Sequence, residues 1–442
     1  VAGMSTQLAD ITEVEYRELQ LERVVLVSVW TSGSEVDAEN SLAELKLLAE
    51  TAGSDVLDGL IQRRRHPDPA TFIGRGKVDE LRQVVIGTGA DTVICDGELE
   101  PAQLRNLEDR VGVKVVDRTA LILDIFAQHA KSAEGKAQVE LAQLQYLRQR
   151  LRGWGGNLSR QAGGRAAAGA GIGGRGPGET KIEIDRRRIK TRISQLRHRL
   201  RELDAVRETK RSQRRRNQVP SVAIVGYTNA GKSSLLNRLT GAGVLVEDAL
   251  FATLDPTTRR SETGDGRQYT LTDTVGFIRH LPHDLVEAFR STLEESVQAD
   301  LLLHVVDGSD ADPFGQIAAV REVLSGIGAA GVAEQLVVNK VDLAEPDALL
   351  ALRGAHPEAV FVSARTGEGT AVLRQRIEDR LPRPAVEVTA LVPYDRGDLI
   401  NRIHQAGEFV SSEHTAEGTL VVARVNSDLA GELARYATGG PS

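Results

Sequence analysis

Apolar residues in the first part of the chain gather in short runs and in stripes, separated by polar stretches. The short runs predict strands, and the stripes with a spacing of three or four residues predict helices. These elements follow one another at 24–30, 41–52, 78–85, 92–95, 99–110 and 113–116. Because strands alternate with helices, we expect an N-terminal α/β subdomain with a parallel sheet over 1–135.

A longer helical pattern follows over 136–218, and it rests on two apolar stripes with coiled-coil spacing. The stripes consist of Leu144, Leu147 and Leu151, and of Ile189, Ile193, Leu196, Leu200 and Leu203. We expect two long helices packed as an antiparallel hairpin and joined by 153–178. That connection holds eleven glycines, so we expect it to lack a rigid structure of its own.

Charge separates this hairpin from the rest of the chain. The formal net charge is −7, yet residues 136–219 hold 22 Lys or Arg against 7 Asp or Glu, a local balance of +15. Positive charge concentrated on one segment is typical of proteins that bind nucleic-acid backbones. The alternative is a solvated charged helix, but such helices usually interleave both signs.

The expected tip of the hairpin adds one aromatic ring and three arginines, at Trp154, Arg160, Arg165 and Arg175. A ring can stack on bases, and arginines can contact phosphates, as in many proteins that bind single-stranded RNA. We therefore interpret the tip as a probe that becomes ordered on RNA. A flexible linker with a hydrophobic anchor is the alternative.

The strongest local motif is a glycine-rich turn between an apolar strand at 222–225 and an amphipathic helix at 232–240. The turn consists of Gly226, Tyr227, Thr228, Asn229, Ala230, Gly231, Lys232 and Ser233. Glycines at both ends let backbone N–H groups surround phosphate oxygens, and a helix N-terminus favours negative charge. We predict that Lys232 reaches the terminal phosphates and takes part in catalysis, while Ser233 binds Mg²⁺.

Two later motifs predict which base is bound. Asn339, Lys340, Val341 and Asp342 follow one apolar strand, and Ser363, Ala364 and Arg365 follow another. The Asp342 carboxylate can accept hydrogen bonds from guanine N1–H and from the N2 amino group, whereas adenine offers no such pair. Such a site rejects an analogue without these groups by about four to five orders of magnitude. A backbone N–H of 363–365 would meet guanine O6, so we expect GTP.

Two segments between these motifs are candidates for sensing the third phosphate. One is Asp273, Thr274, Val275 and Gly276; the other begins with Phe251, Ala252, Thr253, Leu254 and Asp255. We predict that Asp273 holds Mg²⁺ through water and that Gly276 donates its N–H to the γ-phosphate. Thr253 is our choice for the remaining magnesium ligand and a catalytic residue, with Thr257 and Thr258 as alternatives.

The position after Gly276 holds Phe277, where many GTPases have a glutamine that orients water. A phenylalanine ring has no group that can do so. A residue supplied by a partner can accelerate phosphoryl transfer by about three to five orders of magnitude. We therefore expect slow intrinsic hydrolysis and strong activation by a partner, with His280 and His283 as alternative catalytic groups.

Other features of the chain set its general class. The 442 residues suggest about three domains, and Leu381-Pro382-Arg383-Pro384 marks the end of a nucleotide-binding domain at 219–382. The sequence shows no membrane-spanning run and no secretory signal, so we expect a cytoplasmic protein. Cys95 is the only cysteine, and its apolar neighbours predict a buried position. Residues 73–77 lack the length and the Ser or Thr of a phosphate loop, so we interpret them as a turn before a helix.

Beyond the nucleotide motifs, the whole chain resembles the HflX family of ribosome-associated GTPases. The matching segments are Thr71–Lys77, Asp117–Thr119, Ile122–Phe126, Gly173–Thr180, Phe251–Arg259, Asp273–Ile278 and Tyr394–Leu399. The resemblance implies an α/β protein whose P-loop GTPase domain has a mixed, mostly parallel sheet. It also implies the N-terminal α/β subdomain, the basic antiparallel hairpin and a small C-terminal α/β domain at 385–435.

The function that the resemblance implies depends on the ribosome. GTP-bound members of the family bind the large ribosomal subunit and separate stalled ribosomes into subunits, chiefly under stress. The basic hairpin would reach ribosomal RNA near the peptidyl transferase centre. We expect a monomer that uses GTP and Mg²⁺ with the large subunit as partner. A GTPase for large-subunit assembly stays open as an alternative, and so does a signalling switch with a docking coiled coil.

Overall fold

The structure is a computed structural model, and it falls into two compact units. It describes residues 23–162, 177–216, 219–241, 250–251, 253–264, 266–279, 285, 289–382, 386–425 and 427–438. Unit 1 comprises the described parts of Val1–Leu203, Ala249–Phe251 and Arg279–Phe289, and unit 2 comprises the remainder. Two short pieces of the predicted nucleotide-binding domain thus pack with the N-terminal region, which the sequence did not predict.

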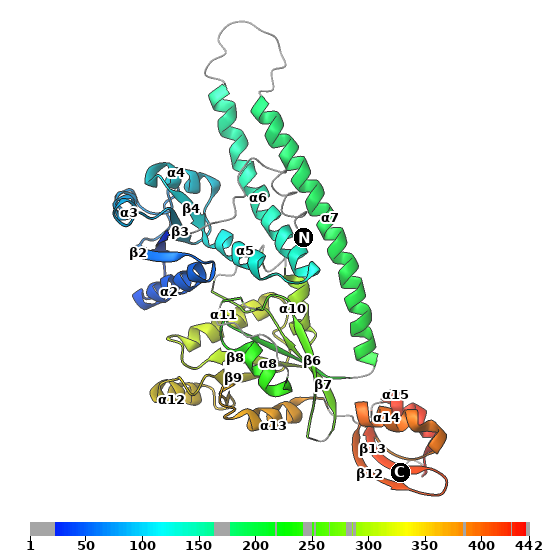
Figure 1. Cartoon of the computed structure of the whole chain (residues 1–442). Helices are drawn as coiled ribbons and strands as arrows, with labels where there is room; N and C mark the ends of the chain where they lie inside the picture. Colours follow the sequence, from blue (N-terminus) through cyan, green and yellow to red (C-terminus); the bar gives the residue numbers. More distant parts are fainter. Residues whose placement is uncertain are drawn as a thin grey trace. The chain divides into compact units, whose positions relative to one another are not determined.

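Unit 1 begins with a four-stranded parallel sheet in the order β2-β1-β3-β4. Its strands are β1 (Arg23–Trp30), β2 (Asp55–Arg63), β3 (Thr92–Asp96) and β4 (Lys114–Asp117). The helices are α2 (Glu35–Thr51), α3 (Arg75–Thr88), α4 (Pro101–Val111) and α5 (Arg118–His129). Helices α3 and α4 cover one face of the sheet, and α2 and α5 cover the other (Figure 1). The predicted parallel α/β subdomain is confirmed.

The core of this subdomain consists of the alternate strand residues that face α3 and α4. Val25, Val27, Val93 and Cys95 pack there with Leu81 and Leu107, and all six are almost fully buried. Cys95 is buried as predicted, and burial raises the pKa of its thiol above its ordinary value. The thiol is therefore an apolar core group and not a nucleophile.

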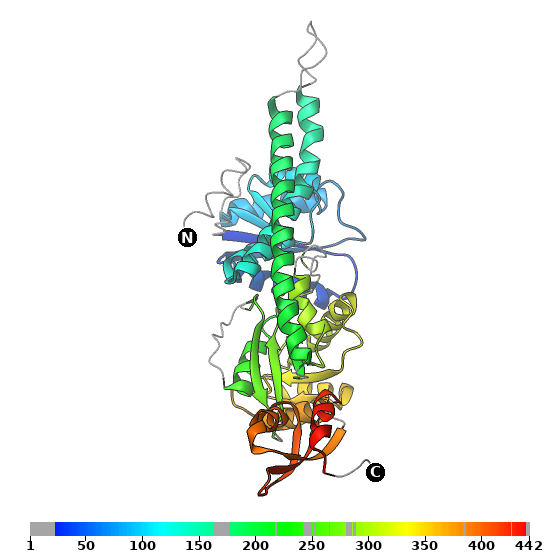
Figure 2. The same cartoon turned by 90° about the vertical axis from the view of Figure 1, so that its right-hand side faces the viewer.

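The hairpin consists of α6 (Ala133–Ala162) and α7 (Pro177–Arg216), which lie side by side in both views (Figures 1 and 2). Their shared core contains seven of the eight predicted stripe residues, all except Leu203, namely Leu144, Leu147, Leu151, Ile189, Ile193, Leu196 and Leu200. The helical hairpin was therefore correctly predicted. Its connection is shorter than the expected 153–178, because α6 continues to Ala162. Glycine lowers helix propensity by about 1 kcal/mol but keeps its N–H, so glycines do not by themselves end a helix. Residues 163–176 of the expected tip lie outside the described part.

Unit 2 contains the nucleotide-binding domain, which has a six-stranded sheet in the order β10-β9-β8-β5-β7-β6. The strands are β5 (Ser221–Gly226), β6 (Thr257–Glu262), β7 (Gln268–Asp273), β8 (Leu301–Asp307), β9 (Glu334–Asn339) and β10 (Val360–Phe361). The helices are α8 (Lys232–Thr240), α10 (Arg290–Val297), α11 (Pro313–Gly326), α12 (Pro346–Ala355) and α13 (Thr370–Arg380). Only the β6–β7 pair is antiparallel among these pairings, so the predicted mixed, mostly parallel sheet is confirmed.

The C-terminal domain belongs to the same unit and has an antiparallel sheet in the order β11-β13-β12. It contains β11 (Val386–Val392), η1 (Tyr394–Arg396), α14 (Gly397–Ala406), β12 (Glu408–His414), β13 (Thr419–Val425), α15 (Ser427–Leu433) and η2 (Ala434–Tyr436). Leu399 and Ile403 of α14 pack on Val421 and Ala423 of the central strand. The expected additional C-terminal domain is confirmed.

Candidate guanine-nucleotide site

The turn between β5 and α8 has a backbone that only glycine fits at two positions. Gly226 has φ 152°, and a Cβ there would overlap the carbonyl oxygen of Val305. Gly231 has φ 86°, and a Cβ there would overlap the side-chain amide of Asn339. Asn229 also lies in the left-handed region, which asparagine tolerates better than most residues. The sequence thus specifies a tight loop that wraps around the N-terminus of α8.

Backbone hydrogen bonds fasten this loop to the segment that follows β7. Thr228 N–H donates to the carbonyl of Phe277 at 2.8 Å, and Phe277 N–H donates to the carbonyl of Gly226 at 3.1 Å. The Phe277 side chain is completely buried. Phe277 therefore links the loop to 273–276, one of the two segments predicted to sense the third phosphate, which we call the switch segments. Its ring offers no group to a water molecule.

Three oxygen-bearing side chains converge beside the loop. The Ser233 hydroxyl donates to Asp273 Oδ2 at 2.6 Å and lies 2.8 Å from the hydroxyl oxygen of Thr253. The three residues come from the start of α8, the end of β7 and the segment before β6. These are the three residues that the sequence predicted as ligands of Mg²⁺, and the structure brings them together.

The chemistry of this cluster fits a hard cation. Asp273 is fully buried, and its Oδ1 atom has no hydrogen-bond partner among the described residues. Burial raises the pKa of Asp273, while the Lys232 ammonium opposes that shift. A buried carboxylate with an unused oxygen, flanked by two hydroxyls, is a donor set that Mg²⁺ prefers.

The alternative threonines lie elsewhere. Thr257 begins β6 and pairs in register with Asp273, so it is part of the sheet. The Thr258 hydroxyl lies 3.0 Å from the hydroxyl of Thr272 on the neighbouring strand. Thr253 is thus the threonine of this segment that the structure places beside Ser233.

Lys232 is the cation of the loop, and only 6% of its surface is exposed. Its ammonium donates to the carbonyl of Tyr227 at 2.7 Å. Burial lowers the pKa of Lys232 to about 8, and the nearby Asp273 carboxylate opposes that shift. A Cβ at Gly276 would lie 2.7 Å from the Thr228 methyl group and 3.0 Å from Lys232 Nζ. Because Gly276 has no Cβ, the space beside the Lys232 ammonium stays open.

The base motifs are connected to the loop through Asn339. Its amide nitrogen donates to the carbonyl of Ala230 at 2.9 Å, and its amide oxygen accepts from Ala364 N–H at 3.0 Å. One buried side chain thus ties the phosphate loop to 363–365. The next residue, Lys340, has φ 60° and pairs with Asp307 at 2.7 Å.

Asp342 is paired with Arg365, for which the sequence predicted a backbone contact with guanine but no side-chain role. Arg365 Nη2 lies 2.9 Å from Asp342 Oδ2, so the arginine covers the carboxylate that we predict reads guanine. A hydrogen bond from Ser363 is the largest cause that lowers the pKa of Asp342. The carboxylate is therefore ionised at neutral pH, as an acceptor of guanine N–H groups must be.

The other predicted residues fall into three groups. Tyr227, Ala230, Leu254, Val275 and Ser363 are buried, and the hydroxyl of Thr274 donates to the carbonyl of Ile224 at 2.8 Å. Phe251 packs within unit 1, and Asp255 and Val341 are partly exposed. Ala252, His280 and His283 lie outside the described residues.

No group of three or more His, Cys, Asp or Glu side chains is placed to hold a metal ion in the described part. No described helix combines the length and the apolar character needed to cross a bilayer.

A strand, a phosphate loop with its lysine and serine, an aspartate on the neighbouring strand and an Asn-Lys-x-Asp motif define a P-loop GTPase. Comparison with family models agrees. Residues 221–340 match the model described as "50S ribosome-binding GTPase". Residues 39–127 match "GTP-binding GTPase N-terminal", and 129–214 match "GTP-binding GTPase Middle Region". The chain is a GTPase and binds guanine nucleotides.

Curated relatives give the family. The GTPase HflX of Caldanaerobacter subterraneus subsp. tengcongensis is 47% identical over 415 residues, which are 94% of each chain. The GTPase HflX of Escherichia coli K12 is 46% identical over 387 residues, covering 87% of this chain and 88% of its own. The chain therefore belongs to the HflX family of GTPases, which confirms the resemblance seen in the sequence.

A solved structure titled "crystal structure of SsGBP and GDP complex" is also similar. It is 27% identical and covers 81% of this chain and 98% of its own, with a TM-score of 0.45.

Proposed function

We propose that the GTP-bound protein binds the large ribosomal subunit through ribosomal RNA and separates stalled ribosomes into subunits. Two findings support the ribosome as partner, namely membership of the HflX family and the match of 221–340 to a family model named for 50S ribosome binding. On the basis of this proposed partner, we further propose that the protein acts in the cytoplasm, and as a monomer. The observation that carries the RNA contact is the charge on α7.

The outer surface of α7 presents arginines and lysines that the protein itself leaves exposed. Arg187, Arg188, Lys190, Arg197, Arg199 and Arg201 are exposed on α7. Arg192, by contrast, is used inside the hairpin, where it forms a bidentate pair with Glu140 at 2.6 and 3.0 Å. Pairing with Glu140 raises the pKa of Arg192. These exposed cations can neutralise phosphates and release counterions.

We propose roles for the site residues on the same basis. Ser233, Thr253 and Asp273 would hold Mg²⁺, which neutralises charge on the β- and γ-phosphates when it is bound. Lys232 would pair with the same phosphates, and the N–H of Gly276 would bind the γ-phosphate. Asp342 would read guanine. Since Phe277 is buried, the ribosome would supply the group that orients the attacking water.

Light scattering tests this function directly. Intact ribosomes mixed with the protein and a non-hydrolysable GTP analogue should lose scattering as the subunits separate, and GDP should give no loss. The test variant reverses Arg187 and Arg188 to Glu, which should weaken binding about tenfold or more at low salt and flatten its salt dependence. Reversal of the exposed Arg82 and Arg110 of the N-terminal subdomain is the matched control.

Three results would contradict the proposal. Binding without any loss of scattering, combined with co-sedimentation on immature large-subunit particles, would favour the assembly GTPase. Ribosome affinity that is independent of salt, or that the hairpin reversal leaves unchanged, would remove the RNA contact. Without ribosome association of any kind, the GTP site alone would remain.

A further inference from the structure

Helix α5 of the N-terminal subdomain contacts two segments that belong, by sequence, to the GTPase domain. The ring of Phe126 meets the ring of Phe251 edge-to-face, with centroids 4.7 Å apart. The same ring meets Phe289 in the same manner at 4.8 Å. All three rings are almost fully buried. All three residues lie in unit 1, so these contacts belong to one compact unit.

The first residue of α5 makes a polar contact with the second of these segments. Arg118 is 2% exposed and donates to the carbonyl of Arg279 at 3.1 Å. The same guanidinium pairs with Glu44 at 2.6 Å and with Asp96 at 2.8 Å. Two carboxylates from α2 and β3 therefore fix the orientation of the arginine. A planar guanidinium held at two points presents its remaining donor in one direction.

Both contacted segments are direct continuations of the predicted switch residues. Phe251 lies two positions before Thr253, and Arg279 lies three positions after Gly276. Phe251 also has φ 58°, which is unfavourable for a bulky side chain and persists only where the surroundings fix it. The aromatic cluster fixes it here. The chain thus enters one switch segment and leaves the other at points that α5 holds.

The start of α5 is also joined to α6 of the basic hairpin. Asp117 is the N-cap of α5 and is completely buried. Its carboxylate accepts hydrogen bonds from the Tyr146 hydroxyl at 2.7 Å and from Arg150, both on α6. The Arg150 guanidinium also lies over the Tyr146 ring, 4.2 Å from its centroid. A displacement of α5 would therefore act on α6 of the hairpin.

We infer that α5 couples the two switch segments to the basic hairpin, with Arg118 and Phe126 as positioning residues. When the third phosphate draws Thr253 and Gly276 inward, the chain at Phe251 and Arg279 changes its contacts with α5. Asp117 passes that change to α6. Such coupling is reciprocal, so whatever occupies the hairpin must alter the relative affinity for GTP and GDP by the same factor. The inference rests on the proposed function only where it names RNA as the occupant.

The first test measures nucleotide affinity without ribosomes, so it can be read even if the proposed function fails. The quantity is the Kd for GDP divided by the Kd for a non-hydrolysable GTP analogue. Phe126→Leu keeps an apolar side chain but loses the edge-to-face ring contacts. Arg118→Lys keeps the positive charge but loses the planar set of guanidinium donors. Both should change this ratio about fivefold or more and leave the GDP affinity within twofold, because GDP lacks the phosphate that the switch segments sense.

Leu107→Ala is the matched control, because Leu107 is completely buried in the core under α3 and α4, on the face of the sheet opposite α5. A variant that is merely less stable should leave the affinity ratio unchanged. If the control changes the ratio as much as Phe126→Leu does, or if neither variant changes it, the inference is wrong.

The second test follows the hairpin directly by hydrogen exchange of backbone amides in α6. In the wild type, replacing GDP by the GTP analogue should change exchange over 137–151 severalfold. In Phe126→Leu that change should fall at least twofold, while exchange in α8 still responds to the nucleotide. Equal exchange in α6 with both nucleotides in the wild type would overturn the coupling, even if the protein binds ribosomes.

Discussion

The GTPase domain and the N-terminal subdomain each place a turn with two glycines and a lysine before a helix. In the GTPase domain, Lys232 is buried and Gly226 and Gly231 adopt positive φ angles that bend the loop around α8. In the N-terminal subdomain, Gly74 is the N-cap of α3 with φ −67°, and Lys77 pairs with Glu80 at 2.8 Å. The two turns share composition but differ in which groups they leave available.

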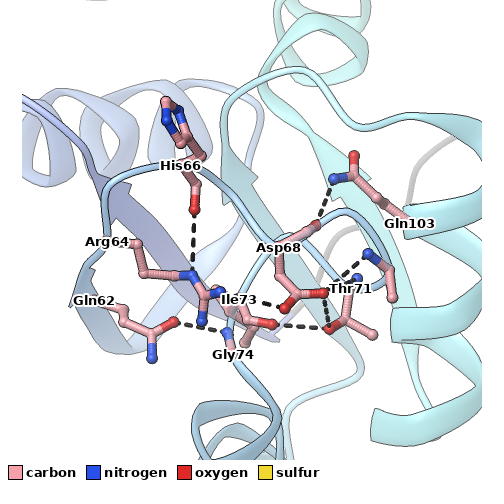
Figure 3. A network of polar contacts seen from close by, with 9 residues as sticks. Gln62, Arg64, His66, Asp68, Thr71, Ile73, Gly74 and Gln103 are labelled. Carbon is pink, nitrogen blue, oxygen red and sulfur yellow. Dashed lines mark hydrogen bonds and ion pairs between the residues drawn. The ribbon is translucent and has the colours of Figure 1, made fainter.

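The N-terminal turn satisfies its own polar groups (Figure 3). Gly74 N–H donates to Gln62 Oε1 at 2.8 Å, and Asp68 Oδ1 accepts from the N–H of Ala70 and of Thr71. A Cβ at Gly74 would overlap the guanidinium of Arg64. The N–H of Gly74 and the ammonium of Lys77 thus already have partners within the subdomain, which disfavours a phosphate there. The comparison teaches that a phosphate site is recognised by unused donors as much as by glycines and lysine.

The largest expected effect separates the two lysines. Lys232→Ala should lower the rate of GTP hydrolysis by about 10²–10³-fold, because a preorganised cation beside the phosphates is lost. Lys77→Ala should leave hydrolysis within twofold. Single-turnover hydrolysis at saturating GTP measures both. Equal loss in the two variants would mean that both turns act on the nucleotide.

A second change tests how the base is read on the GTPase side. Asp342→Asn removes a charged acceptor of two guanine hydrogen bonds, each of which contributes about 1.5–3 kcal/mol. GTP affinity should fall by about 10²–10⁴-fold, while xanthosine triphosphate, which presents an oxygen in place of the N2 amino group, should gain affinity. Competition titrations with both nucleotides measure the exchange of preference. Unchanged GTP affinity would show that Asp342 does not contact the base.

The next prediction compares one glycine from each domain, and the expected effects are smaller and opposite in direction. Gly276→Ala would place a methyl group against Thr228 and Lys232, so analogue binding should weaken while the fold survives. Gly76→Ala meets no atom within 4 Å and lies in helical α3. It should raise the free energy of unfolding by about 0.4–1 kcal/mol. Denaturant unfolding and analogue titration of both variants are the measurements, and destabilisation by Gly76→Ala would contradict the described helix.

The smallest expected effect is on the stability of the GTPase domain at acidic pH. His304 is completely buried on β8, burial lowers its pKa, and its hydrogen bond with Glu334 at 2.6 Å only partly opposes that shift. An unfolded histidine takes up a proton below about pH 6.5, whereas folded His304 does not, so stability falls as pH drops below that value. The pKa of Glu334 is lowered to about 2, so the unfolded chain takes up this proton first and the domain loses further stability between about pH 4.5 and 2.

The measurement is the melting temperature of each unit between pH 7.5 and 5.5. The GTPase domain should lose stability over this range, and His304→Gln should reduce the loss. The N-terminal sheet buries Cys95, whose raised pKa keeps it neutral throughout. Identical pH profiles for wild type and His304→Gln would contradict the role of the histidine.

Much of this architecture follows from contiguous patterns. Continuous apolar runs predicted β1, β3 and β4, but β2 escaped because Asp58 and Gly59 interrupt it and much of it is exposed. The nucleotide motifs were readable because each is a short, unbroken stretch. Contacts between distant residues were not readable, such as Asn339 with Ala230 or Arg365 with Asp342.

The role of α5 shows the same limit. Arg118 stands at the start of an otherwise apolar helix, and a buried arginine requires carboxylate partners, which is a signal that could have been noticed. Which carboxylates they are, and that the guanidinium also meets the carbonyl of Arg279, depends on chain folding over 161 residues. Phe251 was predicted to belong to the nucleotide site, whereas its ring packs on Phe126.

The most direct test of the account is the rate of GTP hydrolysis with and without purified large ribosomal subunits. The account predicts slow hydrolysis by the protein alone and an acceleration of about 10³-fold or more by the subunits, because Phe277 is buried and a partner must complete the site. Fast hydrolysis by the protein alone, with no further gain from large subunits, would contradict it.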